Sequence, residues 1–187
     1  MAVNNRDISQ DQVSQEINLA DYLDRTPTEQ EAQDFIDLAK ERIIERTQGG
    51  KNVDGRKFIQ YSKEYAQEKG VGRNQVDLTL FGDMLESING EQDGERVVIK
   101  IEGQEATKAF AHITGYEGHP TIPNGKYKRD FFGLTDKEAK SIAERVKQFD
   151  RLSELRQTID IASIIERIGI QLGEDNNNGP WKCYARH

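Results

Sequence analysis

Residues 76–88 read Val76-Asp77-Leu78-Thr79-Leu80-Phe81-Gly82-Asp83-Met84-Leu85-Glu86-Ser87-Ile88, and the expected fold is organised around them. The pattern predicts an extended piece from Asp77 to Leu80, a turn at Gly82 and then a short helix. Because apolar side chains occur on both halves, we expect a hydrophobic core to hold the turn. We interpret four residues as core, with Asp77 and Asp83 as turn and cap residues: Leu78, Leu80, Met84 and Leu85.

A long helix is predicted upstream of this stretch. Thr26 is a suitable N-cap, Pro27 suits the first helical position, and Glu29 would close a capping box. The helix is expected to end at Gly49-Gly50. Its apolar stripe recurs at three- and four-residue spacing: Phe35, Ile36, Ala39, Ile43 and Ile44.

A second long helix is predicted near the C-terminal end of the domain. Thr135 is its expected cap, and Glu138 completes a second capping box. Shorter helices are expected over residues 62–69 and 104–113. The buried face of the second long helix is predicted to contain Ala139, Ile142, Ala143, Val146 and Phe149.

Strand signals are fewer. The side chains of residues 96–102 are expected to alternate between the two faces of a strand, with Val97, Ile99 and Ile101 on one face. A short strand is also expected from Arg129 to Leu134, whereas residues 89–94 read as a polar turn. Residues 114–128 form a long irregular segment, and connections of that length are usually functional or mobile.

These elements predict an α+β fold, in which a small sheet is packed by the long N-terminal helix and the second long helix. We expect an N-terminal arm over residues 1–25, the α+β domain over residues 26–150, and a C-terminal extension over residues 151–187. Residues 1–16 are rich in polar side chains, which favours a mobile arm; the alternative is an arm that orders against a neighbouring subunit.

The composition is polar and acidic. Only 35% of the 187 residues are hydrophobic, 32% are charged, and the net charge is -7. This indicates either exposed tails or a chain that completes its burial against partners. The acidic balance argues against general nucleic-acid binding.

A single cysteine excludes a disulfide framework, and neither a secretory signal nor a membrane span is expected.

No residue pattern indicates catalysis, cofactor binding or a metal site, so we do not expect an enzyme. No histidine lies at zinc-ligand spacing from another histidine or from Cys183. A nucleophilic pair of Cys183 and His187 would require the terminus to fold into a pocket. Two basic clusters are either solvated loops or contacts for an acidic neighbour or DNA phosphates: Lys51, Arg56 and Lys57, and Lys126, Lys128 and Arg129.

Several segments together resemble the virion-morphogenesis family of tailed bacteriophages, the tail-completion or head–tail joining proteins. The resemblance begins at Gly55-Arg56-Lys57-Phe58, continues through residues 61–66, 76–88 and 111–115, and ends at residues 129–135. Order and spacing agree over roughly residues 27–150. The motif residues are Phe58, Tyr61, Tyr65, Asp77, Leu78, Leu80, Gly82, Asp83, Met84, Leu85, Arg129, Phe131, Phe132 and Gly133.

The resemblance implies a small domain with a long helix packed on a sheet, and a structural role without a cofactor. Such subunits form rings, commonly sixfold, in the phage neck, where they contact connector or tail proteins and let genomic DNA pass without sequence-specific binding. It implies a virion protein assembled in the bacterial host cytoplasm. Alternatives are a tail terminator ring on the tube or sheath, an assembly chaperone absent from mature particles, and, third, an enzyme.

The two termini and the long irregular loop are the expected contacts to neighbouring subunits. Both termini and the long loop over residues 114–128 could add helices or strands to a partner. The candidate interface residues are Tyr22, Tyr116, His119, Ile164, Ile165, Ile168, Trp181 and Tyr184.

Overall fold

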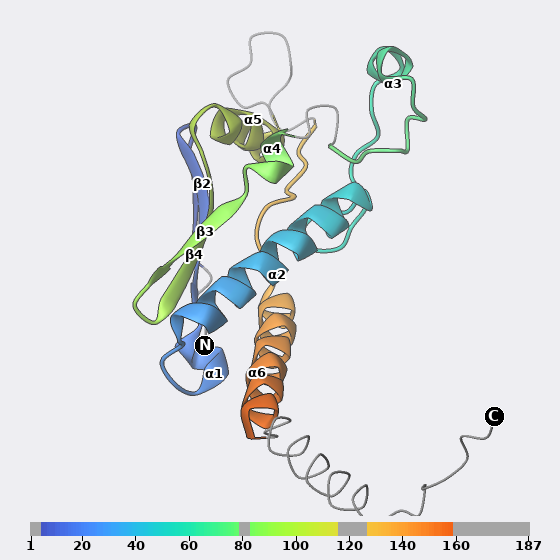
Figure 1. Ribbon diagram of the computed structural model, residues 1–187. Coiled ribbons are helices and arrows are strands. Elements are labelled where there is room, and N and C mark those ends of the chain that lie inside the picture. The colour runs from blue at the N-terminus through green and yellow to red at the C-terminus, as the bar shows by residue number, and fades with distance from the viewer. Residues whose placement is uncertain (1–4, 79–82, 116–126, 159–187) are drawn as a thin grey trace, which may run out of the picture. The chain divides into compact units, whose positions relative to one another are not determined.

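The computed structural model describes residues 5–78, 83–115 and 127–158, with side chains described up to residue 152 (Figure 1). The chain divides into two units, Met1–Lys147 and Gln148–His187. The sheet and most of the helices belong to the first unit, and the described part of the second unit is the continuation of helix α6 (Asp136–Thr158). Among the described residues, no helix combines the length and apolar character needed to cross a membrane.

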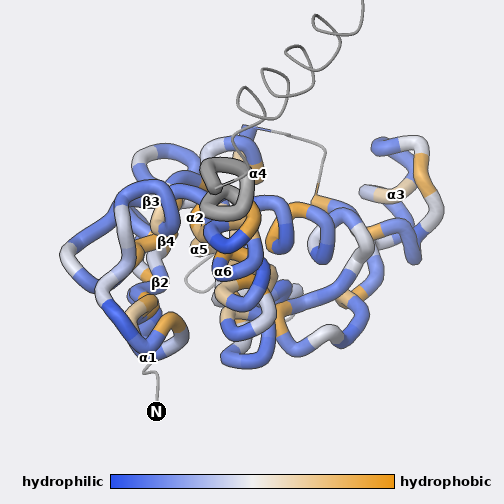
Figure 2. The backbone as a smooth tube through the Cα atoms, turned by 60° about the horizontal axis from the view of Figure 1, so that its bottom comes forward, coloured by the Kyte–Doolittle hydropathy of each residue, from blue (hydrophilic) through white to orange (hydrophobic). Residues whose placement is uncertain are grey.

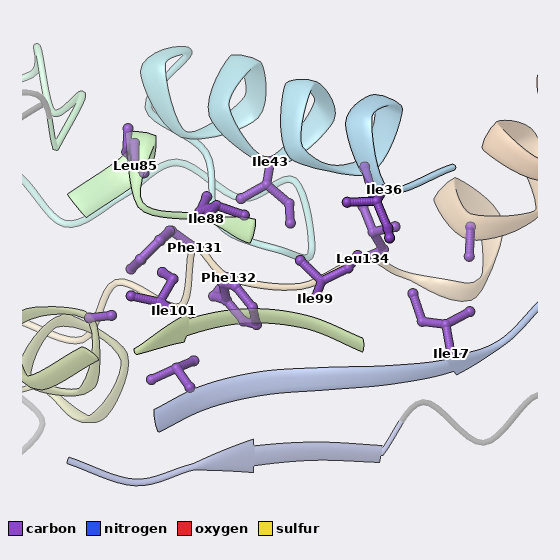
Figure 3. Packing of buried hydrophobic residues seen from close by; sticks show 14 of the residues in the cluster. Ile17, Ile36, Ile43, Leu85, Ile88, Ile99, Ile101, Phe131, Phe132 and Leu134 are labelled. Carbon is purple, nitrogen blue, oxygen red and sulfur yellow. The ribbon is translucent and has the colours of Figure 1, made fainter. Parts of the chain in front are cut away.

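The first unit is built on a four-stranded antiparallel sheet with the order β1-β2-β4-β3. β1 (Asn5–Ile8) and β3 (Asn89–Asp93) are the edges, and β2 (Gln12–Asn18) pairs with β4 (Arg96–Glu102) in the middle. Long helix α2 (Glu29–Gln48) packs against this sheet, as Figures 1 and 3 show. The predicted α+β class, with a long helix on a small sheet, is confirmed.

For residues 5–16 the predicted mobile arm is wrong, because residues 5–8 and 12–18 form two strands of the sheet. Val13 and Ile17 are completely buried on one face of β2, and Gln15 between them is buried as well. Polar residues interrupt this alternation, so the local pattern gave no strand signal. Pairing with β4, far along the chain, orders β2 instead. A single helical turn, α1 (Ala20–Leu23), follows β2.

The first predicted long helix is confirmed as α2 (Glu29–Gln48), but it begins later than expected. Thr28 is the N-cap and shares a capping box with Glu31, so the assignment to Thr26 and Glu29 is wrong. Both threonines have a glutamate three residues downstream, and local sequence therefore offered two equivalent starts. The stripe faces the sheet (Figure 3), with buried Phe35, Ile36, Ala39 and Ile43.

The shorter helices are α3 (Lys63–Lys69), α4 (Asp83–Glu86) and α5 (Gly103–Thr114), and the predicted pair around residues 62–69 and 104–113 is confirmed. Gly70 and Gly115 end α3 and α5 in the left-handed conformation, with φ of 70° and 78°. Asp83 is the first residue of α4 rather than its cap, so its predicted role is wrong.

The second long helix is α6, and its predicted capping box is confirmed. The Thr135 N–H donates to Glu138 Oε2 at 3.0 Å, and the Glu138 N–H donates to Thr135 Oγ1 at 3.3 Å. Phe149 was expected on the buried face but is 44% exposed, so that assignment is wrong. The buried face consists of Ala139, Ile142, Ala143 and Val146.

The predicted polar turn over residues 89–94 is mostly strand β3, which pairs with β4 as a hairpin. Its sequence is polar because alternate side chains point to solvent and Gly90 occupies the position next to α2. A Cβ on Gly90 would lie 2.8 Å from Ile36 Cγ2 and 3.0 Å from the Val98 carbonyl oxygen. Glycine at this position thus allows α2 to approach the sheet.

Replacing Gly90 with alanine is expected to lower the free energy of unfolding by about 1–3 kcal/mol, because the backbone of β4 cannot yield to the added methyl group. Gly72→Ala is the matched control: its Cβ would meet the flexible Gln75 side chain at 3.3 Å. Urea denaturation of both variants measures the difference. Equal stability of the two variants would contradict close packing of α2 on β3.

Candidate functional site: the 129–134 segment and the Tyr61 cluster

Residues 129–134 precede α6 as an irregular segment, so the predicted short strand is wrong. Phe131 and Phe132 are completely buried, and Figure 3 shows both within the core between α2 and the sheet. Gly133 has φ of 95°, a backbone conformation that interrupts a strand and that glycine adopts without strain. The backbone polar groups of this segment have no strand ladder and need other partners.

Arg46 of α2 supplies several of these partners. Its Nη2 donates to the carbonyl oxygens of Phe131 at 2.8 Å and Gly133 at 2.6 Å. Its Nη1 donates to Glu138 Oε2 at 2.7 Å, and Arg46 is only 5% exposed. Arg46 lies in the last turn of α2, where no local signal distinguishes it from a surface arginine.

The two N-terminal strands hold the same segment from the sheet side. Gln15 Nε2 donates to the Leu134 carbonyl at 2.9 Å, and the Leu134 N–H donates to Gln15 Oε1 at 2.7 Å. Arg6 forms a bidentate ion pair with Asp130, with contacts of 3.1 and 2.5 Å. Polar side chains from β1, β2 and α2 therefore fix the path of residues 129–134.

Hydrogen bonds determine the charge state at the centre of this network. Burial alone would raise the pKa of Glu138, but the Thr135 N–H, Arg46 and Arg42 together lower it below its usual range. Burial lowers the pKa of Arg46, while the attraction of Glu138 opposes that change. Removal of either partner would leave the other as a buried, uncompensated charge.

A second cluster surrounds Tyr61, which is 3% exposed. Its ring meets Tyr65 edge-on at a centroid distance of 4.8 Å, and the Arg129 guanidinium lies 5.2 Å from its centre. Lys69 Nζ donates to the Tyr61 hydroxyl at 3.2 Å and to Asp77 Oδ1 at 2.5 Å. The structure thus brings Tyr61 together with three other motif residues, Tyr65, Asp77 and Arg129, and adds Lys69, which sequence reasoning did not select.

The contacts around Tyr61 hold this part of the chain together, and they are poorly suited to proton transfer. Burial opposes the charge on Lys69, but Asp77 and Tyr61 outweigh it and raise the pKa of this ammonium group. Lys69 is therefore protonated at neutral pH and is a poor general base. Arg73 Nε also donates to the Tyr61 carbonyl at 3.0 Å. This bond joins the start of the 61–77 segment to a residue near its end. Within the described residues, no group of three or more His, Cys, Asp or Glu side chains could hold a metal ion.

The remaining motif residues are mostly core. Phe58, Leu78, Met84 and Leu85 are buried. Leu78 has φ of 54°, which is unusual for a branched side chain, and Asp77 next to it binds Lys69. Leu80 and Gly82 lie outside the described residues.

Of the candidate interface residues, only Tyr22 lies within the described part of the chain. Its hydroxyl donates to Asp136 Oδ1 at 2.6 Å, so it links α1 to the start of α6. Burial and the nearby carboxylates raise the pKa of Tyr22. The others lie outside the described residues: Tyr116, His119, Ile164, Ile165, Ile168, Trp181 and Tyr184.

Among the described residues, His112 is a titratable group whose ionisation should affect stability at mildly acidic pH. Burial and the neighbouring Arg129 charge lower its pKa from 6.5 to about 4. Between these values the unfolded chain binds a proton that the folded chain does not bind. Stability is therefore expected to be complete above about pH 6.5 and to fall by about 3 kcal/mol as the pH drops to about 4.

Urea denaturation from pH 4 to pH 7 measures this dependence. The variant His112→Gln lacks the titrating ring and should show a flatter slope between about pH 4 and 6.5, whatever its absolute stability. The acid sensitivity that Glu138 contributes is common to both proteins. Identical slopes in the two proteins would show that His112 does not carry the effect.

Most of the described motif residues thus build a packed core and two polar clusters. Comparison of the chain with protein-family models, with curated proteins and with solved structures gave no match.

Proposed function

We propose that this protein is a structural subunit of a tailed-bacteriophage neck, which assembles into a ring that joins or completes the tail. The observation that carries the proposal is the ordered set of motifs between residues 27 and 150, which resembles the tail-completion and head–tail joining family. Its described members are concentrated in the core and around Tyr61, where they would define the shape of a subunit.

The architecture supports this proposal. The resemblance implies a small domain with a long helix on a sheet, and α2 packs on a four-stranded sheet. Such a scaffold is rigid, because side chains of β1, β2 and α2 bind the 129–134 segment. A ring component must keep its shape while DNA passes and the tail attaches.

Composition gives further support. Hydrophobic residues make up 35% of the chain, which suits a subunit that buries additional surface only on assembly. The net charge of -7 suits a channel lining that repels genome phosphates and keeps DNA mobile. At physiological salt this repulsion acts over about 8 Å. A basic or neutral channel wall in the assembled ring would contradict this part of the proposal.

Imaging of intact particles at subunit resolution, combined with mass spectrometry of purified virions, tests the assignment. We expect a ring of this chain, of the commonly sixfold kind, between the connector and the tail. Contact with tube or sheath subunits would identify a tail terminator instead. Absence from mature virions would favour an assembly chaperone, and turnover by the isolated chain would overturn a purely structural role.

A further inference from the structure

A short basic hairpin projects from the first unit just after α2. Residues 51–57, called the basic hairpin below, are closed by a bridge between Lys51 and Lys57 and by a hydrogen bond from the Asn52 N–H to the Arg56 carbonyl at 2.8 Å. The Val53 N–H donates to the Asp130 carbonyl at 2.8 Å, which anchors the hairpin to the 129–134 segment. Its cations are therefore held in place before any partner arrives.

The hairpin displays more positive charge than it can neutralise internally. Lys51, Arg56 and Lys57 are all exposed. Arg56 pairs with Asp54 at 2.7 Å, whereas Lys51 and Lys57 make no ion pair with any residue that the structure describes. The chain has a net charge of -7, so this hairpin is a local basic surface on an acidic protein. Its charge is complementary to that of an acidic partner.

An acidic surface is present on the sheet. Alternate side chains of the strands point away from α2, and the register aligns them in rows, such as Glu16, Val98 and Glu91. We call this the outer face; its charged residues are Asp7, Glu16, Glu91, Asp93, Glu102, Arg96 and Lys100. The outer face therefore carries five carboxylates and only two cations.

The two cations of the outer face are already paired within it. Arg96 binds Glu16 at 2.5 Å, and Lys100 lies 3.1 Å from Glu91 and 3.2 Å from Glu102. Asp7 and Asp93 are exposed and have no ion pair among the described residues. The excess negative charge is therefore directed outward.

The hairpin and the outer face lie on opposite sides of the same unit. α2 packs on the core face of the sheet, and the hairpin follows the C-terminal end of α2 (Figures 1 and 2). Asp130, to which the hairpin is anchored, binds Arg6 on that same core face. A single copy therefore cannot dock its own hairpin on its own outer face.

We propose that the basic hairpin of one copy docks on the outer sheet face of the next copy, and that this contact joins subunits head to tail. The inference rests on the proposed function, because it specifies the subunit contact of the ring. Contacts between two different patches are heterologous, and they close into a ring when the rotation between copies permits. Complementary charge steers the encounter and defines the register.

Charge reversal tests the contact by analytical ultracentrifugation of the full chain. The hairpin variant is Lys51→Glu, Arg56→Glu and Lys57→Glu, and the face variant is Asp7→Lys and Asp93→Lys. Each alone should self-associate more than about tenfold more weakly than the native chain, since like charges then meet. An equimolar mixture of the two, and a chain with all five changes, should both recover assembly.

The control variant reverses three exposed cations on α6, Lys137→Glu, Lys140→Glu and Arg145→Glu, and should assemble normally. Normal assembly of the hairpin variant, or no recovery in the mixture, would overturn the contact while leaving the proposed function intact. A native chain that never assembles would overturn both. If the hairpin variant loses only binding to duplex DNA, the hairpin serves DNA and the inference is wrong.

Discussion

Replacing Arg46 with methionine is expected to lower the free energy of unfolding by about 3–5 kcal/mol. Methionine fills much of the arginine volume but donates no hydrogen bonds. The carbonyl oxygens of Phe131 and Gly133 would lose their 2.8 and 2.6 Å donors, and Glu138 would lose its most buried partner. Unsatisfied buried polar groups cost more than the net contribution of the bonds themselves. Urea denaturation at neutral pH measures the loss.

Arg42→Met is the matched control for this experiment. Arg42 binds the same carboxylate at 2.9 Å, but its side chain is 44% exposed, whereas that of Arg46 is 3% exposed. Water can replace the exposed pair, so we expect a loss of less than about 1 kcal/mol. Similar losses at the two positions would show that Arg46 does not hold the 129–134 segment.

Replacing Phe132 with alanine is expected to lower the free energy of unfolding by about 3–5 kcal/mol, because the cavity lies in a core that cannot fully collapse. Phe132 is completely buried, and its ring meets that of Phe131 edge-on at a centroid distance of 6.4 Å. The expected loss is large because this residue packs between the sheet and α2 (Figure 3). Urea denaturation again provides the measurement.

Phe149→Ala makes the same chemical change at a residue that is 44% exposed, and its cost should remain below about 1 kcal/mol. This control also tests a correction, since the helical spacing alone predicted Phe149 to be buried. If both substitutions cost several kcal/mol, Phe149 is covered in solution. If neither does, the 129–134 segment is not part of the core.

Local signals predicted the two long helices and the clearest strand. The stripe of α2, the capping box of α6 and the alternation of β4 each follow from residues close together in the sequence. These signals also placed α3 between Ser62 and Gly70. They could not distinguish between two equally suitable N-caps at the start of α2, which could begin after Thr26 or after Thr28.

Strand β2 and the 129–134 segment could not be predicted in this way. Gln15 is polar, yet it is completely buried because Leu134, on a distant part of the chain, satisfies both its donor and its acceptor. Residues 129–134 carry a strand-like apolar pattern, but Gly133 and the carbonyl groups that Arg46 binds hold them in an irregular path. Their partners are adjacent only in the folded chain.

The residues of the candidate site were likewise only partly identified before the structure was known. The resemblance selected Tyr61, Asp77 and Arg129, and the structure places them in one cluster. It did not select Lys69, because an exposed and a buried lysine look alike in sequence; burial of its ammonium group beside Asp77 distinguishes it.

In the stretch Asp77–Ile88, the core residues could be identified from local sequence, and Leu78, Met84, Leu85 and Ile88 are indeed buried. The α+β class could also be predicted, because helix and strand periods are properties of near neighbours. The burial of particular polar side chains, such as Arg46, Gln15 and Lys69, depended on long-range folding. A buried polar group depends on partners that long-range folding brings within hydrogen-bonding distance.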